Sequence, residues 1–323
     1  MFYRLLLQYL TLVFGLLLWP AAQAADNDKA LEWIVGYAAG GGSDVVARSV
    51  AEEMGRQLKR PVIVNNKPGA ATNIAAEYVA RSKDFGNVML SADLATLSAN
   101  PTLFSKLSYS AEKDLASVSL LARFPLILIV SNKIPVKNFK EFLAWAKANP
   151  DALTYASAGA GSPHHLTMEL LAEQAGLKLT HIPYRGAAPA LTDVAGGQVP
   201  FMFVDTASGN QFIAAGRVKA IGVAGSKRIK TSPEIPTLAE QGLKGFEAYA
   251  WQGVAVPSGT SVETIKALNK ALVAALNSAP VKARFQVLGV EPIPSTPEEM
   301  TAYAKAERER WARVIRNNHI TID

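Results

Sequence analysis

Two turns rich in small residues are the parts of this chain best suited to bind a ligand, and each lies between a predicted strand and a predicted helix. Glycine lets backbone N–H groups come close to a ligand, and a helix N-terminus adds unpaired amides and the positive end of the helix dipole. The sequence therefore predicts an anion-binding site formed by backbone N–H groups, at the start of a helix that begins near Ser43. A plain turn capped by Ser43 is the alternative. The first turn consists of Tyr37, Ala38, Ala39, Gly40, Gly41, Gly42, Ser43 and Asp44.

The second turn follows a predicted strand at residues 153–156, and a third turn of similar composition runs over residues 67–73 and ends at Asn73. Serine followed by proline is a strong helix start, so the second turn is also expected to present a helix N-terminus. One such turn on each of two facing sheets would hold a carboxylate from both sides. The residues expected to contribute from the second turn are Ser157, Gly159, Gly161, Ser162 and His165.

Neither of the common nucleotide-binding motifs fits the first turn. No Gly-Lys-Ser/Thr follows the glycines, and Asp44 and Val45 stand where a G-x-G-x-x-G motif would need its last glycine. The sequence therefore does not indicate a nucleotide cofactor, and no cofactor is expected.

The first 24 residues have the pattern of a secretory signal peptide. Arg4 precedes an apolar run over residues 5–19, and the small-residue site Ala22-Gln-Ala24 follows it. The run is shorter than the roughly 20 residues that cross a bilayer. We therefore expect cleavage between Ala24 and Ala25 and a periplasmic location. An uncleaved anchor helix is the alternative.

Composition narrows the classes of protein further. The chain has no cysteine, so no disulfide stabilises the exported fold. Its 49% apolar residues are enough to form a large hydrophobic core. The net charge is +6, but the basic residues are scattered and form no stripe interleaved with aromatic residues. Nucleic-acid binding is therefore not favoured.

Short apolar runs alternate with helical patterns, which predicts an α/β protein with parallel sheets covered by helices. Thr260 with Glu263, and Thr296 with Glu299, predict capping boxes at the last long helices. The expected strands lie at residues 31–35, 61–65, 88–92, 126–130, 153–156, 179–184, 200–204, 219–223 and 249–256.

The length of the chain predicts two domains, because about 300 residues exceed what one core usually serves. Strand-like segments at residues 120–130 and 220–224 indicate that the chain crosses between the domains twice. We expect residues 25–124 and 225–323 to form one domain and residues 125–224 to form the other. Open α/β sheets bind ligands at the carboxyl ends of their strands, so the ligand cleft is expected between the domains.

Motifs along nearly the whole mature chain resemble those of the extracytoplasmic substrate-binding proteins of the tripartite tricarboxylate transporter system, the Bug family. Each motif is weakly specific, and their order along the chain carries the resemblance. The matching residues are Tyr37 to Asp44 with Arg48, Val62 to Asn66 with Gly69 and Asn73, Asn100 with Pro101, Leu153 to Ser157, Ser162 with His165, His181 to Tyr184, Gly186 with Pro189, Gly197 to Val199, Phe203 with Asp205, and Trp311.

The resemblance implies a two-domain periplasmic-binding-protein fold of the Venus flytrap, type II-like kind, with a ligand cleft between domains joined by two hinge strands. It also implies a small carboxylate ligand held by main-chain amides and bridging waters, and delivery of that ligand to separate membrane permease subunits.

Single side chains leave several alternatives open. Asp44 and Arg48 stand four apart on a predicted helix, which favours an intrahelical ion pair over an arginine that holds the ligand. His164 and His165 diverge by about 100° on a helix and do not reach the number of ligands that a metal site needs, so no metal is expected. Asp205 ends a strand and either accepts from a ligand or caps the next helix.

Two further interpretations concern catalysis and aromatic stacking. A hydrolase would place Ser157 or Ser162 beside a histidine and an acid, but neither serine lies in a G-x-S-x-G motif. Tyr249 and Trp251 alternate with apolar neighbours, which indicates core positions rather than a ligand stack.

The sequence thus predicts a monomeric binding protein, not an enzyme, that captures a dicarboxylate, tricarboxylate, amino-acid or aromatic carboxylate for a tripartite tricarboxylate-type transporter. A ligand-sensing subunit for a signalling receptor and a periplasmic hydrolase are the alternatives.

Overall fold

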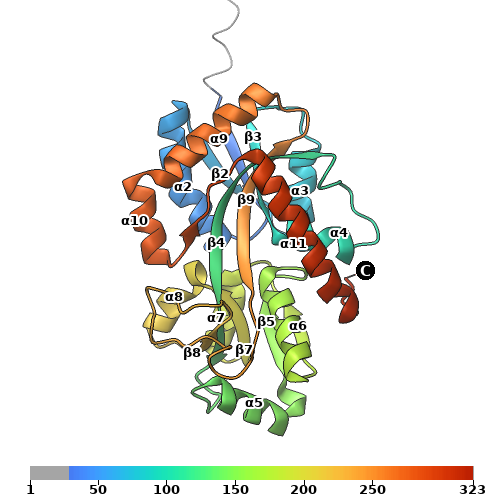
Figure 1. Ribbon diagram of the computed structural model, residues 1–323, viewed down its shortest axis with the longest axis vertical. Coiled ribbons are helices and arrows are strands. Elements are labelled where there is room, and N and C mark those ends of the chain that lie inside the picture. The colour runs from blue at the N-terminus through green and yellow to red at the C-terminus, as the bar shows by residue number, and fades with distance from the viewer. Residues whose placement is uncertain (1–28, 323) are drawn as a thin grey trace, which may run out of the picture.

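The structure is a computed structural model that describes residues 29–322, so the predicted leader lies outside the described residues. It has two lobes, one above the other (Figure 1). The strands are β1 (Leu31–Val35), β2 (Val62–Asn66), β3 (Val88–Asp93), β4 (Leu115–Ser131), β5 (Thr154–Ser157), β6 (Thr180–Pro183), β7 (Phe201–Asp205), β8 (Val218–Val223), β9 (Tyr249–Pro257) and β10 (Glu291–Pro292).

Helices cover the sheets of both lobes (Figure 1), as the α/β prediction requires. They are α2 (Gly42–Leu58), α3 (Asn73–Ala80), α4 (Asn100–Leu103), α5 (Phe139–Ala148), α6 (Pro163–Ala175), α7 (Ala187–Gly196), α8 (Thr206–Ala214), α9 (Val262–Asn277), α10 (Ala279–Leu288) and α11 (Pro297–Asn317). Short 3₁₀ or π turns lie at Ala70–Thr72, Ala95–Ala99 and Pro150–Ala152.

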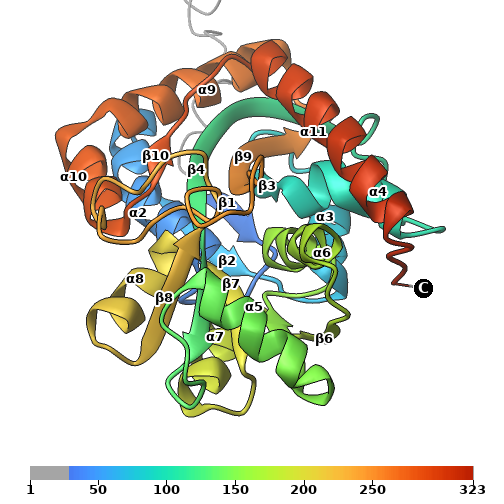
Figure 2. The ribbon, with the colours of Figure 1, turned by 60° about the horizontal axis from the view of Figure 1, so that its bottom comes forward.

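The strand predictions are correct to within one residue at each end, with one exception. Residues 126–130 are only the second half of β4, which is 17 residues long and arches from the first lobe into the second (Figure 2). The first half of β4 pairs with β9 as far as Pro125, and from Leu126 onward β4 pairs with β7 and β8. Pro125 has no N–H to donate, so it suits the point where the partner strand changes.

The sheet is mixed, which corrects the expectation of purely parallel sheets. Its order is β2-β1-β3-β9-β4-β7-β5-β6. The outer strands pair in parallel on both sides, as βα units require. The central strands β9 and β4 are antiparallel to their neighbours because the chain passes between the lobes and returns there.

The predicted strand near residues 220–224 is β8, and a long excursion follows it. Strand β8 ends at Val223 while still paired with β4, and residues 225–248 then form a long excursion before β9. A backbone hydrogen bond from Ala248 to Ala224 closes the base of this excursion.

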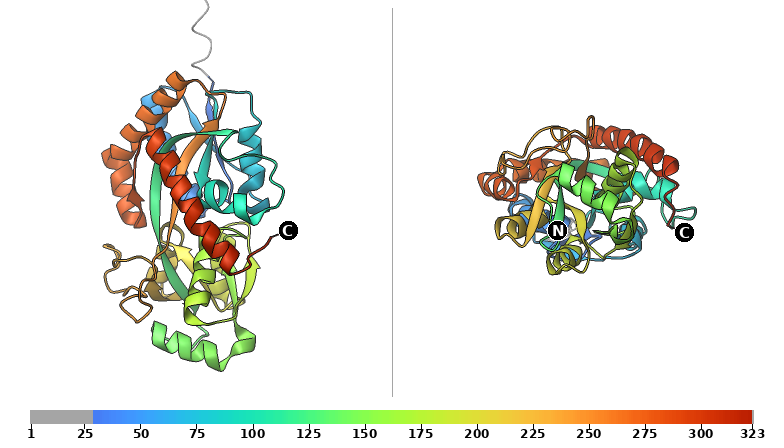
Figure 3. Two further views of the ribbon diagram at one scale, coloured as in Figure 1. Left: turned by 45° about the vertical axis from the view of Figure 1, so that its right-hand side comes forward. Right: turned by 90° about the horizontal axis from the view of Figure 1, so that it is seen from below.

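Helix α11 belongs to the first lobe but extends down to the second (Figure 3). Near its C-terminal end, the Asn318 amide donates to the Glu173 carboxylate at 2.9 Å. The start of the helix is the predicted capping box of Thr296 and Glu299. The other predicted box is wrong, because Ser261 caps α9 and the buried Thr260 hydroxyl has no partner in the described part of the chain.

Candidate functional site

The first glycine-rich turn leads into α2 one residue earlier than predicted. The helix begins at Gly42, and Gly41 is its N-cap in an extended conformation without a side-chain hydrogen bond. Ser43 therefore does not cap the helix, which corrects that alternative. The backbone N–H groups of the first turn of α2 have no acceptor within the helix, as at every helix N-terminus.

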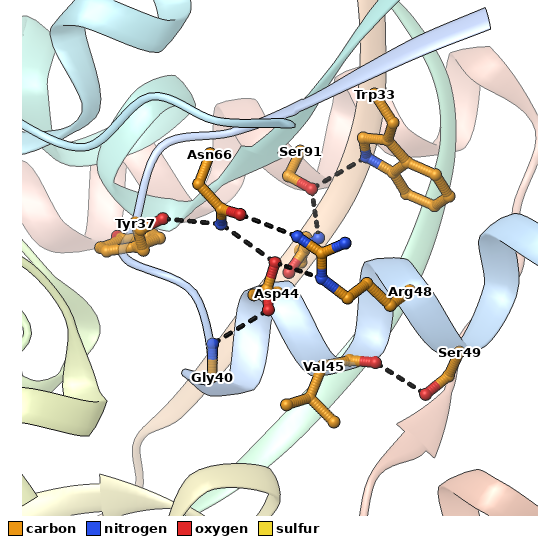
Figure 4. A network of polar contacts seen from close by, with 10 residues as sticks. Trp33, Tyr37, Gly40, Asp44, Val45, Arg48, Ser49, Asn66 and Ser91 are labelled. Carbon is orange, nitrogen blue, oxygen red and sulfur yellow. Dashed lines mark hydrogen bonds and ion pairs between the residues drawn. The ribbon is translucent and has the colours of Figure 1, made fainter. Parts of the chain in front are cut away.

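Asp44 holds this turn in shape (Figure 4). Its buried carboxylate accepts from the Gly40 amide at 2.9 Å, from Arg48 Nε at 2.9 Å and from Asn66 Nδ2 at 3.0 Å. Burial raises the pKa of Asp44, but these hydrogen bonds outweigh burial and hold the pKa below its usual value. The predicted pair of Asp44 with Arg48 is confirmed, and the arginine points along the helix flank.

The second turn is fixed by side chains behind it. Ser162 caps α6 by accepting from the His165 amide, as predicted. His165 Nδ1 accepts from the Gly161 amide at 3.0 Å, and Gly161 has a φ of 72°. The Ser157 hydroxyl accepts from the Gly159 amide at 3.0 Å. The amide of Gly161 is thus satisfied within the protein.

A buried histidine, His165, and a half-buried one, His181, stack behind this turn. The rings of His165 and His181 lie 3.9 Å apart, and His181 Nε2 lies 2.6 Å from the Ser157 hydroxyl. Burial lowers the pKa of His165 to about 3, with a contribution from His181, and lowers the pKa of His181 to about 4. Both rings are therefore neutral near pH 7. Ser157 is fully buried, and its hydroxyl supports the turn through Gly159 and His181.

The two lobes touch where the first glycine-rich turn meets the loop after β6 and the start of α8. The Gly42 amide donates to the Ser208 hydroxyl at 2.7 Å, and the Ala38 amide donates to the Arg185 carbonyl at 3.0 Å. Asp205 lies against Gly42, because a Cβ on that glycine would be 2.1 Å from Asp205 Oδ1. Two of the amides predicted to bind the ligand thus bridge the lobes.

A cleft between the lobes has two compartments that share Tyr37 and Ala158. The hinge compartment encloses about 430 Å³ and the loop compartment about 1060 Å³, both including space open to solvent. The hinge compartment is lined by Tyr37, Gly41, Gly42, Ser43, Asp93, Phe124, Ala158, Pro163, His164, Ala187, Asp205, Ala250, Trp251 and Gln252.

The loop compartment is built largely by the third turn and by the end of β6. Ala70, Ala71 and Thr72 all have positive φ, an uncommon conformation for residues other than glycine. Arg185 is the charged side chain among the residues described around this compartment. Asn73, a predicted ligand-binding residue, accepts a hydrogen bond from Asn100 Nδ2 through its carboxamide oxygen at 2.7 Å.

The predicted site residues divide into three groups. Tyr37, Gly41, Gly42, Ser43 and Asp205 line the hinge compartment, and Tyr37 and Gly159 line the loop compartment. The other predicted residues support the turns or lie beside them and are not among the residues described around either compartment. They are Ala38, Ala39, Gly40, Asp44, Asn73, Ser157, Gly161, Ser162 and His165.

Sequence reasoning missed the residues that the hinge strands contribute. Phe124, Ala250, Trp251 and Gln252 come from β4 and β9, where the lobes join. Trp251 is only 1% exposed, so its assignment to the core is correct, although the residue also borders the cleft. An alternation of apolar and polar residues does not reveal such a position, because the pattern is the same for a core strand.

Two carboxylates in the hinge compartment are already supplied with donors. Asp93 accepts from the Tyr37 hydroxyl at 2.6 Å and from both the amide and the hydroxyl of Thr96. Burial raises the pKa of Asp93 and, together with that carboxylate, raises the pKa of Tyr37. Asp205 caps α8 through the Ser208 amide, so the capping interpretation is correct.

Two polar atoms in the hinge compartment have no partner within the described part of the chain. They are Ser43 Oγ in the first lobe and His164 Nδ1 in the second. A buried polar atom left unpaired costs about 1–3 kcal/mol. Their presence on facing walls of one cleft therefore indicates where a polar ligand completes the hydrogen bonding.

No group of three or more side chains able to hold a metal ion occurs in residues 29–322. Nor does that part of the chain contain a helix with the length and apolar character needed to cross a membrane.

Comparison with known proteins decides the family. A family model described as the tripartite tricarboxylate transporter family receptor matches residues 46–320. The chain belongs to this receptor family. It is similar to the periplasmic binding protein BugD, with 34% identity, a TM-score of 0.88, and coverage of 91% of this chain and 99% of that one.

Two other solved structures of the same shape contain carboxylates. The Rpa4515 protein of R. palustris with adipate is 28% identical, with a TM-score of 0.88 and coverage of 94% of this chain and all (100%) of that one. MatC from Rhodopseudomonas palustris with bound malate is 32% identical, with a TM-score of 0.85 and coverage of 89% and 99%. The predicted two-domain binding-protein fold is thereby confirmed. The family and its structural neighbours are solute-binding proteins rather than enzymes.

Proposed function

We propose that this receptor captures a small organic carboxylate in the periplasm, holds it in the hinge compartment, and delivers it to the membrane permease of a tripartite tricarboxylate-type transporter. The observation that carries the proposal is the pair of unpaired polar atoms, Ser43 Oγ and His164 Nδ1, on opposite walls of one cleft. The malate and adipate bound by two relatives support this class of ligand.

The ends of two helices supply the rest of the site. Helix α2 starts at Gly42 and α6 starts at Pro163, and both residues line the hinge compartment. A helix N-terminus contributes about 0.3–1 kcal/mol to binding an anion, and each hydrogen bond to a charged group about 1.5–3 kcal/mol. A few such contacts reach about −8 kcal/mol, which corresponds to micromolar affinity.

We further propose the predicted leader at residues 1–24, the domain limits of 25–124 with 225–323 and of 125–224, and a monomeric state for the mature chain. Lobe closure over the ligand would then present one surface to the permease.

The test is thermal unfolding of the purified protein with succinate, malate, adipate, citrate, glutamate, benzoate and matched esters and amides. A carboxylate at 100 times its Kd stabilises the protein by about 2.7 kcal/mol, enough for a clear rise in melting temperature. We expect such a rise for some free carboxylates and conversion of none of the panel.

A single variant connects the result to the cleft. Ser43→Ala removes a hydroxyl that only a ligand would pair, so it should weaken binding of a carboxylate by about 12- to 150-fold while leaving the free protein as stable as before. Thr260→Val is the matched control, because it removes another unpaired buried hydroxyl that lies outside the described lining of both compartments. If no carboxylate binds, or if Ser43→Ala and Thr260→Val bind equally well, the proposal is wrong.

A further inference from the structure

His164 lies in the hinge compartment with one ring nitrogen paired and the other free. Its side chain is 6% exposed, and Nε2 lies 3.2 Å from Asp205 Oδ2. Nδ1 is buried and has no partner in residues 29–322. A hydrogen on Nε2 accounts for the contact with Asp205, so Nδ1 is an acceptor when the ring is neutral and a donor when it is protonated.

The charges around His164 decide which state suits an anionic ligand. Asp205 at the end of β7 and Asp93 at the end of β3 line the same compartment, as does the Tyr37 hydroxyl. On its own helix, His165 and Glu169 interact with each other, and His165 stacks with His181 of β6. The lining residues from β9, namely Ala250, Trp251 and Gln252, carry no charge.

Among the residues described around the hinge compartment, none is a lysine or an arginine. His164 is thus the side chain of this lining that can become cationic, by taking up a proton on its ring. A ligand carboxylate placed here would otherwise meet two aspartates and the lone pair of a neutral imidazole.

We propose that His164 is a ligand-binding residue that donates from protonated Nδ1 to the carboxylate, with Asp205 as its counter-ion, so that binding takes up a proton. This inference rests on the proposed function. The proton comes from the solvent and adds to the imidazole ring, and no covalent bond to the ligand forms or breaks.

Asp205 is equipped for the role of counter-ion. Its carboxylate accepts from the amide and the hydroxyl of Ser208, both at 2.9 Å. Burial raises the pKa of Asp205. The hydrogen bond and the charge of His164, together with the hydrogen bonds from Ser208, outweigh this effect and hold the pKa below its usual value. An aspartate that stays ionised favours the protonated form of the ring beside it.

The inference makes affinity depend on pH in a defined direction. Malate and adipate are fully ionised above pH 7, so any proton taken up on binding goes to the protein. Because binding takes up a proton, Kd should rise with pH by up to about tenfold per pH unit. Calorimetry at pH 8 in phosphate and in Tris should report an uptake approaching one proton per ligand.

Three variants test this with malate and adipate as probes. His164→Gln keeps a neutral donor, so it should weaken binding about tenfold at pH 6.5 and abolish both proton uptake and pH dependence. His319→Gln is the matched control, since His319 is exposed near the C-terminus, and it should change neither quantity. Asp205→Asn keeps the helix cap and should move the pH dependence to lower pH.

The outcomes separate this inference from the proposed function. Absence of binding by any carboxylate overturns both. Binding without proton uptake, or with an uptake that His164→Gln leaves unchanged, overturns the inference alone. Loss of the uptake in Asp93→Asn but not in His164→Gln would assign the proton to Asp93 and would also overturn it.

Discussion

Replacing Gly42 by alanine tests whether the contact between the lobes is part of ligand binding. The added Cβ would lie 2.1 Å from Asp205 Oδ1 and 2.7 Å from Asp205 Cγ. Asp205 has little room to withdraw, because Ser208 and His164 hold its carboxylate. The lobes of Gly42→Ala must therefore stay further apart.

The expected loss follows from the contact that closes the lobes. Separation breaks the 2.7 Å hydrogen bond from the Gly42 amide to the Ser208 hydroxyl. The net loss of one such hydrogen bond is about 0.5–1.5 kcal/mol, which corresponds to roughly 2- to 12-fold weaker binding if closure accompanies binding. The free protein should be as stable as before or slightly more stable, since alanine favours the helix more than glycine does.

Calorimetry and thermal unfolding with and without ligand measure the two quantities separately. Gly196→Ala is the matched control, because Gly196 is also helical, in α7, and does not have a left-handed φ. No atom lies within 4 Å of the position that an added Cβ would take. It should bind like the wild type. If Gly42→Ala binds carboxylate as tightly as Gly196→Ala does, closure through this contact plays no part in binding.

Two further outcomes concern the supports of the turns. Arg48→Gln should lower the free energy of unfolding by up to about 1 kcal/mol and leave affinity within about twofold, because the arginine is half exposed and Asp44 keeps its other donors; a large loss of affinity in calorimetry would contradict this. Burial depresses the pKa of His181 in the folded protein to about 4, whereas the pKa in the unfolded chain is about 6.5. The free energy of unfolding should therefore be highest above pH 6.5, where His181 is neutral in both states. It should fall by up to about 1.4 kcal/mol per pH unit as pH drops from 6.5 toward 4. Urea unfolding at pH 7, 6 and 5 should therefore show a flatter pH dependence for His181→Gln than for the wild type, and equal slopes would refute the assignment.

Local patterns in the sequence were enough to predict most elements. The strands alternate with capped helices, and Ser162 and Thr296 cap α6 and α11 as expected. A cap depends on residues within three or four positions, so short-range sequence contains what is needed. Where two hydroxyls are adjacent, as at Thr260 and Ser261, the sequence did not show which one caps the helix.

The sequence by itself determined the α/β class, the two glycine-rich turns and the family resemblance. The tertiary structure decided which atoms face the cleft. His164 and His165 are adjacent on α6, yet the packing of β5 and β6 directs His165 behind the turn, while β7 places Asp205 beside His164. Likewise, Trp251 and Gln252 border the cleft only because β9 pairs with β4 at the junction of the lobes. These contacts join residues far apart in the chain, and no local pattern encodes them.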